Sequence, residues 1–240
     1  GIVWNTAFHI TYQSDRNLND SILSALRQVE NSVSVFKPGS VVSRVNSQSA
    51  TGVDDLFINV YMGARKVWRE SDGAFDPTIS PLITAWGFGK GHRINTGVDV
   101  DSLLQFVGFG KTSLQGNRIS KQDIRTEFNF SAIAKGFGCD YVGEMLKRNG
   151  VRSYLVEIGG EIAVAGVNPK GKEWNISIDR PVVSKKEIHN SIMTVRVTDA
   201  GIATSGNYRN FNEIGNKKFG HTIDTKTGRP ATTDILSATV

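Results

Sequence analysis

Apolar and polar positions alternate along residues 2–12, a segment rich in Thr, Phe and Ile, and this pattern predicts a β-strand. Asn19 and Asp20 are typical of a helix start, and apolar residues then recur at helical spacing through Val29. The chain therefore opens with a strand followed by an amphipathic helix. Residues 35–40 contain Pro and Gly together, which predicts a turn after that helix.

Helical periodicity returns in three later segments: residues 53–70, 101–107 and 132–149. Gly73 and Gly150 follow the first and the last of them and are the expected stops. Residues 75–86 contain two prolines, which exclude a long regular helix there.

The second half of the chain is dominated by strand patterns. A hairpin is expected from residues 118–120 and 126–130, and a second strand pair from residues 201–205 and 218–224. The remaining predicted strands are residues 153–158, 162–165, 174–178, 191–197 and 235–240. Helices that precede a meander of strands favour an α+β fold over a doubly wound parallel sheet.

Composition narrows the class of protein. The 240 residues suffice for one large domain, and the hydrophobic (39%) and charged (21%) shares are those of an ordinary soluble protein. The net charge of +5 is mild and no Lys/Arg-rich run is present, so nucleic acid is not the expected partner. No apolar run approaches the ~20 residues of a membrane helix.

Cys139 is the single cysteine, so the chain has neither an internal disulfide nor a zinc site built from several thiolates. The four histidines are scattered, with no pair at helical spacing. Any bound metal is therefore expected to be a hard ion with oxygen ligands.

A first candidate site begins at Asn129, where a strand pattern runs through small residues into a helix. Free N–H groups and the positive dipole end at such a helix start suit a phosphate. Lys135 is expected in the first turn, where a cation is disfavoured unless an anion is nearby. An ordinary strand-to-helix turn explains the same residues.

Two further candidates lie near the C-terminus. Thr204 and Ser205, with Arg209, are suited to holding a pyrophosphate or a carboxylate, although a polar strand end gives the same pattern. His221 is suited to proton transfer near neutral pH. Asp224 lies close to it in a Thr- and Gly-containing segment that also matches a simple capped turn.

A fourth candidate covers residues 73–89, where aromatic residues stand beside glycines. Such a segment suits stacking on a flat ring system, and equally suits a hydrophobic core.

Taken together and in order, these segments resemble the ApbE family of FAD:protein FMN transferases. The matching blocks are residues 36–46, 75–89, 131–136, 158–161, 203–206 and 221–230. The resemblance spans essentially the whole chain. It implies a single ApbE-like, T-fold-like α+β domain over residues 1–240, with sheets flanked by helices and a flavin site in a cleft between two subdomains.

The resemblance also implies roles for individual residues. His221 matches a histidine that assists the transfer, and Ala132 matches a residue whose backbone carbonyl binds Mg²⁺. Residues at positions of FAD contact or phosphate binding are Trp4, Phe36, Ala74, Phe75, Asp76, Asn129, Lys135, Thr204, Ser205 and Ile223.

Several positions depart from the family pattern. Trp4 replaces a usual Met, Asn129 replaces a usual Asp, and Glu157 and Glu161 stand where Asn and Asp are usual. In the family, a strand like residues 237–240 leads to an Asp and a Thr that bind Mg²⁺. Because the sequence ends at Val240, we expect a lacking C-terminal segment and an incomplete metal site.

The implied reaction is Mg²⁺-dependent transfer of FMN from FAD to a threonine of an acceptor flavoprotein, with release of AMP. Two alternatives stay open: a protein that only binds FAD, and a pyrophosphatase that hydrolyses FAD to FMN and AMP. Residues 234–239 match an acceptor motif only in part and read better as a strand. The family is exported, periplasmic or lipid-anchored at the membrane, which is the expectation for localisation here.

Overall fold

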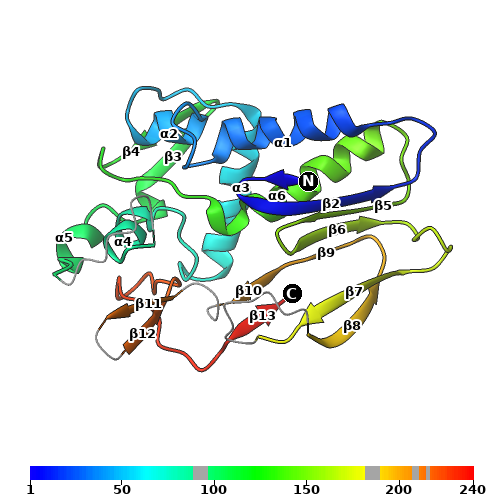
Figure 1. Ribbon diagram of the computed structural model, residues 1–240. Helices are drawn as coiled ribbons and strands as arrows, with labels where there is room; N and C mark the ends of the chain where they lie inside the picture. Colours follow the sequence, from blue (N-terminus) through cyan, green and yellow to red (C-terminus); the bar gives the residue numbers. More distant parts are fainter. Residues whose placement is uncertain (89–96, 182–189, 207–210, 215–216) are drawn as a thin grey trace. The chain divides into compact units, whose positions relative to one another are not determined.

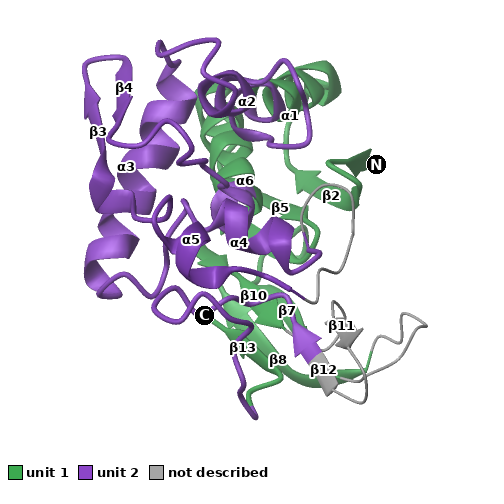
Figure 2. Cartoon of the chain, turned by 90° about the vertical axis from the view of Figure 1, so that its left-hand side faces the viewer, with its two compact units in different colours: residues 1–28, 135–209, 235–240 green, residues 29–134, 210–234 purple. Residues whose placement is uncertain are grey.

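The computed structural model describes residues 1–88, 97–181, 190–206, 211–214 and 217–240. The chain divides into two compact units, coloured separately in Figure 2. Unit 1 comprises residues 1–28, 135–209 and 235–240, and unit 2 comprises residues 29–134 and 210–234. Each unit therefore joins segments that are distant in sequence.

Unit 1 contains an antiparallel sheet with the strand order β1-β2-β5-β6-β9 (Figure 1). The strands are β1 (Ile2–Val3), β2 (Thr6–Tyr12), β5 (Tyr154–Ile158), β6 (Glu161–Ala165) and β9 (Ala200–Ile202). The strand predicted over residues 2–12 is thus confirmed, except that Trp4 and Asn5 interrupt it as a tight turn.

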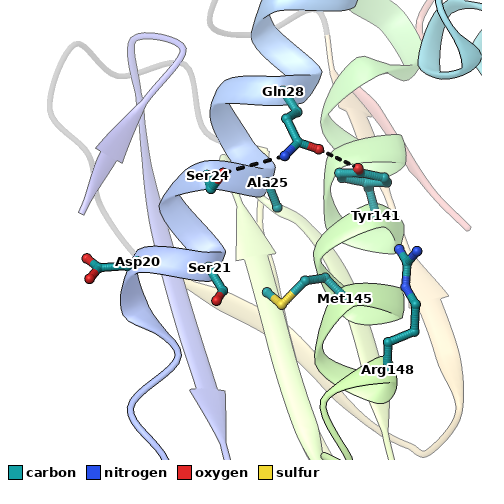
Figure 3. A pocket seen from close by; sticks show the side chains of 8 residues that line it. All are labelled: Asp20, Ser21, Ser24, Ala25, Gln28, Tyr141, Met145 and Arg148. Carbon is teal, nitrogen blue, oxygen red and sulfur yellow. Dashed lines mark hydrogen bonds between the residues drawn. The ribbon is translucent and has the colours of Figure 1, made fainter.

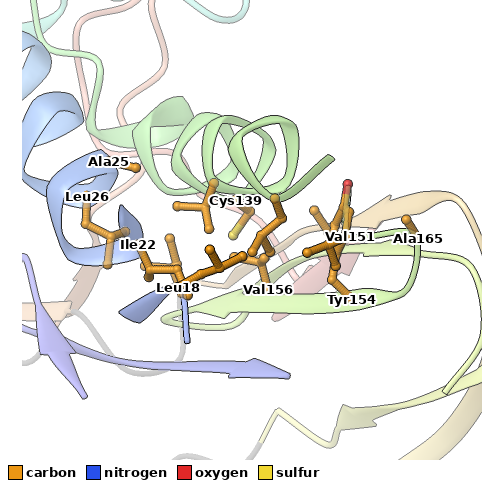
Figure 4. Close-up of a cluster of buried hydrophobic side chains, with 13 residues drawn as sticks. Leu18, Ile22, Ala25, Leu26, Cys139, Val151, Tyr154, Val156 and Ala165 are labelled. Carbon is orange, nitrogen blue, oxygen red and sulfur yellow. The ribbon is translucent and has the colours of Figure 1, made fainter. Parts of the chain in front are cut away.

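One face of this sheet packs against helices. The apolar side chains of Leu18 and the start of α1 (Asn19–Val33) meet those of α6 (Ser131–Arg148) and of the sheet in one buried cluster (Figure 4). Along β5, Tyr154, Val156 and Ile158 alternate into this cluster, as the period of a strand requires. The predicted helices at residues 19–29 and 132–149 are confirmed.

The other side chains of β5 and β6 join a second cluster in unit 1. Leu155 and Ile162 pack with Trp174 and Ile176 of β7 (Trp174–Asp179), which pairs with β8 (Ser191–Val197). The sheet is thus covered on both faces, by helices and by a two-stranded ribbon. A further pair in unit 1 is β10 (Thr204–Gly206) with β13 (Ser237–Thr239).

Unit 2 is built around α3 (Asp55–Glu70), which confirms the helix predicted at residues 53–70. Asp54 caps this helix by accepting a hydrogen bond from the Phe57 amide. Phe57 and Tyr61 then project into an aromatic cluster with Phe109, Phe128 and Phe130. The unit is completed by α2 (Val41–Asn46), α4 (Ser80–Ala85), α5 (Val100–Leu104), a 3-10 turn (Phe109–Lys111), β3 (Thr112–Gln115), β4 (Arg118–Lys121), β11 (Phe211–Ile214) and β12 (Lys217–Gly220).

The hairpin predicted from residues 118–120 and 126–130 is wrong. β4 pairs with β3 instead, and residues 126–130 form no named strand. Their alternation reflects burial, because Phe128 and Phe130 lie in the aromatic core. The Asn46 side chain satisfies both the N–H and the carbonyl of Phe128, and Glu127 forms an isolated parallel bridge with Ile79, so the backbone of this segment is paired without a hairpin.

The predicted pairing of residues 201–205 with 218–224 is also wrong. β9 joins β6, β10 pairs with β13, and β12 pairs with β11. Ala203 separates β9 from β10 and exchanges both backbone hydrogen bonds with Val240. Alternation of apolar and polar residues predicts a half-buried strand but does not identify the strand it pairs with, which explains the error.

α4 is short and has a proline in its first turn, as the two prolines of this segment require. Among the described residues, no helix is both long enough and apolar enough to cross a bilayer.

Candidate functional site

The start of α6 is the first predicted site. Asn129 lies just before the helix, and its side-chain oxygen accepts a hydrogen bond from the Ser131 amide at 2.9 Å. The Asn129 amide in turn donates to the Pro77 carbonyl at 2.7 Å. An amide oxygen thus accepts the Asx-turn hydrogen bond that an aspartate would accept, so the Asn at this position keeps the local structure. Ala132 lies exposed in the first turn.

Lys135 lies five residues into α6 rather than in its first turn, because the helix begins at Ser131. Its ammonium donates to the Gly159 carbonyl at 3.1 Å and lies 2.6 Å from Glu161 Oε2. The anion that a cation near a helix N-terminus requires is therefore supplied, in this structure, by Glu161. The two side chains are 37% and 13% exposed.

The Gly159–Gly160 turn connects β5 and β6 beside Lys135. Both glycines have positive φ, 57° and 99°. Glu157, on the other side of the turn, accepts from the Gly160 amide at 2.7 Å, and its second oxygen lies 2.6 Å from His9 Nδ1. Acidic residues thus fix the turn from both sides, which the sequence showed only as departures from a family pattern.

Trp4 is the first residue of the turn between β1 and β2, where it and Asn5 have positive φ of 49° and 61°. Its indole packs on α6 at Gly138, where an added Cβ would lie 2.4 Å from Trp4 Cη2. The indole Nε1 is buried and has no hydrogen-bond partner among the residues that the structure describes. Gly138 therefore makes room for a tryptophan at position 4.

The block at residues 74–76 presents very different environments. Ala74 is exposed and Phe75 is half-buried, whereas Asp76 is buried. The Asp76 carboxylate accepts from the amide and hydroxyl of Thr78, at 2.8 and 2.6 Å, and from the Phe109 amide at 2.9 Å. Three of the roughly four acceptor sites of this carboxylate are thus used within unit 2. Phe36, by contrast, is 67% exposed in the turn after α1.

His221 opens a loop that is anchored in the core of unit 2. Ile223, two residues later, is 8% exposed and packs with Leu82 and Val100. The His221 ring lies edge-on to Phe88, with ring centroids 6.3 Å apart. The anchor restrains the backbone next to His221, and it uses the Ile223 side chain for packing.

The rest of this loop is held by hydrogen bonds. Trp86 Nε1 donates to the Gly228 carbonyl at 2.8 Å, and Thr225 Oγ1 donates to the Gly73 carbonyl at 2.7 Å. Asp224 accepts from the Lys226 and Thr227 amides, each at 2.8 Å. The Thr227 amide is the main cause that lowers the pKa of Asp224, so Asp224 is the capping residue of a turn.

Thr204 and Ser205 are exposed on β10, and Thr204 Oγ1 lies 2.9 Å from Thr239 Oγ1 of β13. Residues 207–209 of this candidate segment, and residue 89 of the candidate at residues 73–89, lie outside the described residues.

Across the described part of the chain, no group of three or more His, Cys, Asp or Glu side chains is placed to hold a metal ion. The Ala132 carbonyl is the single predicted ligand there, and the predicted metal site stays a prediction. Cys139 is buried, and burial raises the pKa of its thiol to about 12. A thiol with such a pKa stays protonated near neutral pH and is therefore not a nucleophile there.

A groove of about 450 Å³ lies in unit 1 between α1 and α6. Figure 3 shows its lining, in which Tyr141 donates to Gln28 across the groove at 2.6 Å. It contains none of the predicted site residues. The residues that line it are Asp20, Ser21, Ser24, Ala25, Gln28, Tyr141, Met145 and Arg148.

Comparison with known proteins gives consistent matches. The model of the ApbE family matches residues 4–240. A Vibrio cholerae relative named FAD:protein FMN transferase is 32% identical, over 100% of this chain and 75% of its own length. A Haemophilus influenzae relative of the same name is 31% identical, over 100% of this chain and 74% of its own length.

Solved structures agree with the sequence matches. The flavin transferase ApbE from Vibrio cholerae has a TM-score of 0.84 at 30% identity, covering 100% of this chain and 79% of the other. The apo flavinyl transferase ApbE of Pseudomonas stutzeri has a TM-score of 0.86 at 29% identity, covering 100% and 77%. The expected α+β fold is confirmed.

Proposed function

Because the chain belongs to the ApbE family, we propose that it is a FAD:protein FMN transferase, which moves FMN from FAD onto an acceptor flavoprotein. The observation that carries this function is the match of the family model over nearly the whole chain, together with relatives above 30% identity that bear this activity as their name. FAD is then the substrate, and a second protein is the partner.

The proposed reaction is a phosphoryl transfer. An acceptor threonine oxygen forms a bond to the FMN-side phosphorus of FAD, while the bond from this phosphorus to the bridging oxygen breaks. AMP leaves with the bridging oxygen, and the hydroxyl proton passes to a base. His221 is the proposed base, supported by its position on a loop whose backbone Ile223 anchors.

The charge of the pyrophosphate needs stabilisation. Lys135 supports this role because its ammonium is fixed near the N-terminal end of α6 and remains 37% exposed. The hydroxyls of Thr204 and Ser205 are exposed and are proposed as further donors. Asp76 is proposed as a FAD contact from the family position, and its carboxylate also supports the fold through Thr78 and Phe109.

We include Mg²⁺ in this proposal only because of the family resemblance, with the Ala132 carbonyl as one ligand. When bound, such an ion neutralises phosphate charge. Among the described residues, no group of three or more His, Cys, Asp or Glu side chains is placed to join that carbonyl in holding the ion, and no step above is assigned to the metal. Export to the periplasm, or anchoring as a lipoprotein on the outer face of the cytoplasmic membrane, is likewise proposed from the resemblance.

The test is incubation of the purified chain with FAD and Mg²⁺, with and without an acceptor protein whose flavinylation site contains threonine. The expected result is AMP release coupled to an acceptor mass increase equal to FMN. AMP release without labelled acceptor would instead identify a FAD pyrophosphatase. Retention of FAD without AMP would identify a protein that binds FAD without transferring it.

A further inference from the structure

An ion pair in unit 1 connects α6 to the turn between β5 and β6. The Lys135 ammonium lies 2.6 Å from Glu161 Oε2, and the Glu161 side chain is only 13% exposed. A carboxylate this far removed from water is unfavourable unless a cation accompanies it. The pairing therefore explains how a glutamate is accommodated at this position.

Both partners of Lys135 are fixed by the sheet. Gly159 has a φ of 57°, and an added Cβ would lie 2.7 Å from Thr6 Oγ1, so the turn packs closely on β2. Glu161 is the first residue of β6 and pairs with Ile158 of β5. Its carbonyl also accepts a hydrogen bond from Cys139 Sγ of α6 at 3.2 Å. The ammonium is thus held by rigid groups, not by a flexible loop.

An ammonium group has three donor hydrogens. The Gly159 carbonyl accepts one of these hydrogens, whereas Glu161 Oε2 is an ion-pair partner at 2.6 Å whose contact with the ammonium does not have the geometry of a hydrogen bond. No other partner of Lys135 lies in the described part of the chain, and its side chain is 37% exposed, so donor capacity is left for an acceptor from outside. A lysine that is fixed before it meets a ligand loses less conformational entropy on binding.

We propose that Glu161 is a positioning residue, which together with the Gly159 carbonyl fixes Lys135 so that its remaining N–H meets a phosphate oxygen of FAD. This inference rests on the proposed function, because it requires FAD as the ligand of Lys135. It assigns Glu161 no contact with FAD.

The test is a double-mutant cycle on the full chain with Glu161→Ala, Lys135→Met and the double variant. FAD affinity is followed by the change in flavin fluorescence, and kcat and KM for FAD by AMP release. Each single variant is expected to weaken FAD binding about tenfold, mainly through KM, and the double variant no more than Lys135→Met alone. Glu161→Gln, which keeps an acceptor at the same place, is expected to recover part of the loss.

Glu157→Ala is the matched control. Glu157 supports the same turn through the Gly160 amide at 2.7 Å. Its loss disturbs the turn without removing an acceptor of Lys135, so its effect on FAD binding is expected to be the same with and without Lys135→Met. Thermal denaturation of each variant verifies folding, and Glu161→Gln replaces Glu161→Ala in the cycle if the latter does not fold.

Two outcomes would overturn the proposal. One is an effect of Glu161→Ala that persists fully in the Lys135→Met background, which is the signature of a structural role. The other is unchanged FAD affinity in Lys135→Met, which would leave nothing to position. Neither outcome contradicts the proposed function, which is tested separately by flavinylation of the acceptor by the wild-type chain.

Discussion

Lys135 in unit 1 and Asp76 in unit 2 are both charged residues that match family positions of FAD contact, yet their surroundings differ. Asp76 is buried, and its carboxylate accepts three hydrogen bonds from Thr78 and Phe109. Among the described residues, the Lys135 ammonium donates one hydrogen bond, to the Gly159 carbonyl, forms an ion pair with Glu161 and remains partly exposed. A residue in a motif is thus available to a ligand only to the extent that its own fold leaves hydrogen-bonding capacity unused.

The largest expected effect lies at His221. His221→Ala is expected to lower kcat for FMN transfer by about 10²–10⁴-fold, the usual contribution of a general base. The variant should fold, because the His221 side chain is not part of the buried core. Flavinylation of the acceptor measured by mass spectrometry gives kcat, and flavin fluorescence gives FAD affinity, which should change little. Undiminished transfer would remove His221 as the base.

Asp76 provides the next largest effect, and it should appear in stability. Asp76→Ala leaves the buried amides of Thr78 and Phe109 without an acceptor, so the free energy of unfolding should fall by about 2–4 kcal/mol. Urea denaturation measures the change. Glu70→Ala is the control, since Glu70 is exposed and only 3.9 Å from Lys66, and its cost should stay below about 0.5 kcal/mol.

A different result at Asp76 would contradict the difference proposed between the roles of Asp76 and Lys135. If Asp76→Ala costs no more stability than Glu70→Ala but abolishes FAD binding, then the Asp76 carboxylate contacts FAD directly.

Alanine substitutions at two glycines of α6 are expected to have smaller effects on stability, with opposite signs. An added Cβ at Gly138 would lie 2.4 Å from Trp4 Cη2, whereas at Gly136 nothing lies within 4 Å. Gly138→Ala should therefore destabilise by about 1–3 kcal/mol through overpacking. Gly136→Ala should stabilise by about 0.5–1 kcal/mol through helix propensity. Equal effects at both glycines would contradict the packing of Trp4 on α6.

Local signals in the sequence predicted most of the fold. The helices α1, α3 and α6 have strong periodicity and clear ends, and β5 to β8 were bounded by glycines or turns, so their existence followed from the pattern. α2 was not predicted because its six residues are too few to show a helical period. The partners of β4, β10 and β12 were missed because strand pairing is decided by tertiary packing.

The candidate site was predictable in residue identity but not in environment. The motif around Lys135 indicated a cation at a helix start, whereas its ion pair with Glu161 depends on β6 lying beside α6. Likewise, nothing local to Ile223 distinguishes a FAD contact from a core residue, and only the packing with Leu82 and Val100 reveals its anchoring role.

The smallest expected effect concerns Asp224, the capping residue of the loop after His221. Its folded pKa lies below the ordinary carboxyl value of 3.8 because the ionised group accepts from the amides of Thr227 and Lys226. A depressed carboxyl pKa contributes stability that is present above the unfolded pKa and is lost as pH falls through the folded pKa. The difference in Tm between wild type and Asp224→Ala should therefore reach its full value at neutral pH.

As the pH falls below 3.8, that difference should shrink, because protonation removes the negative charge that the two amides stabilise. Calorimetry of both proteins over this range measures it, and the effect should be small because Asp224 is exposed. A Tm difference that stays constant with pH would show that Asp224 supports the loop through its shape alone. In that case the turn, and not its charge, restrains the backbone next to His221.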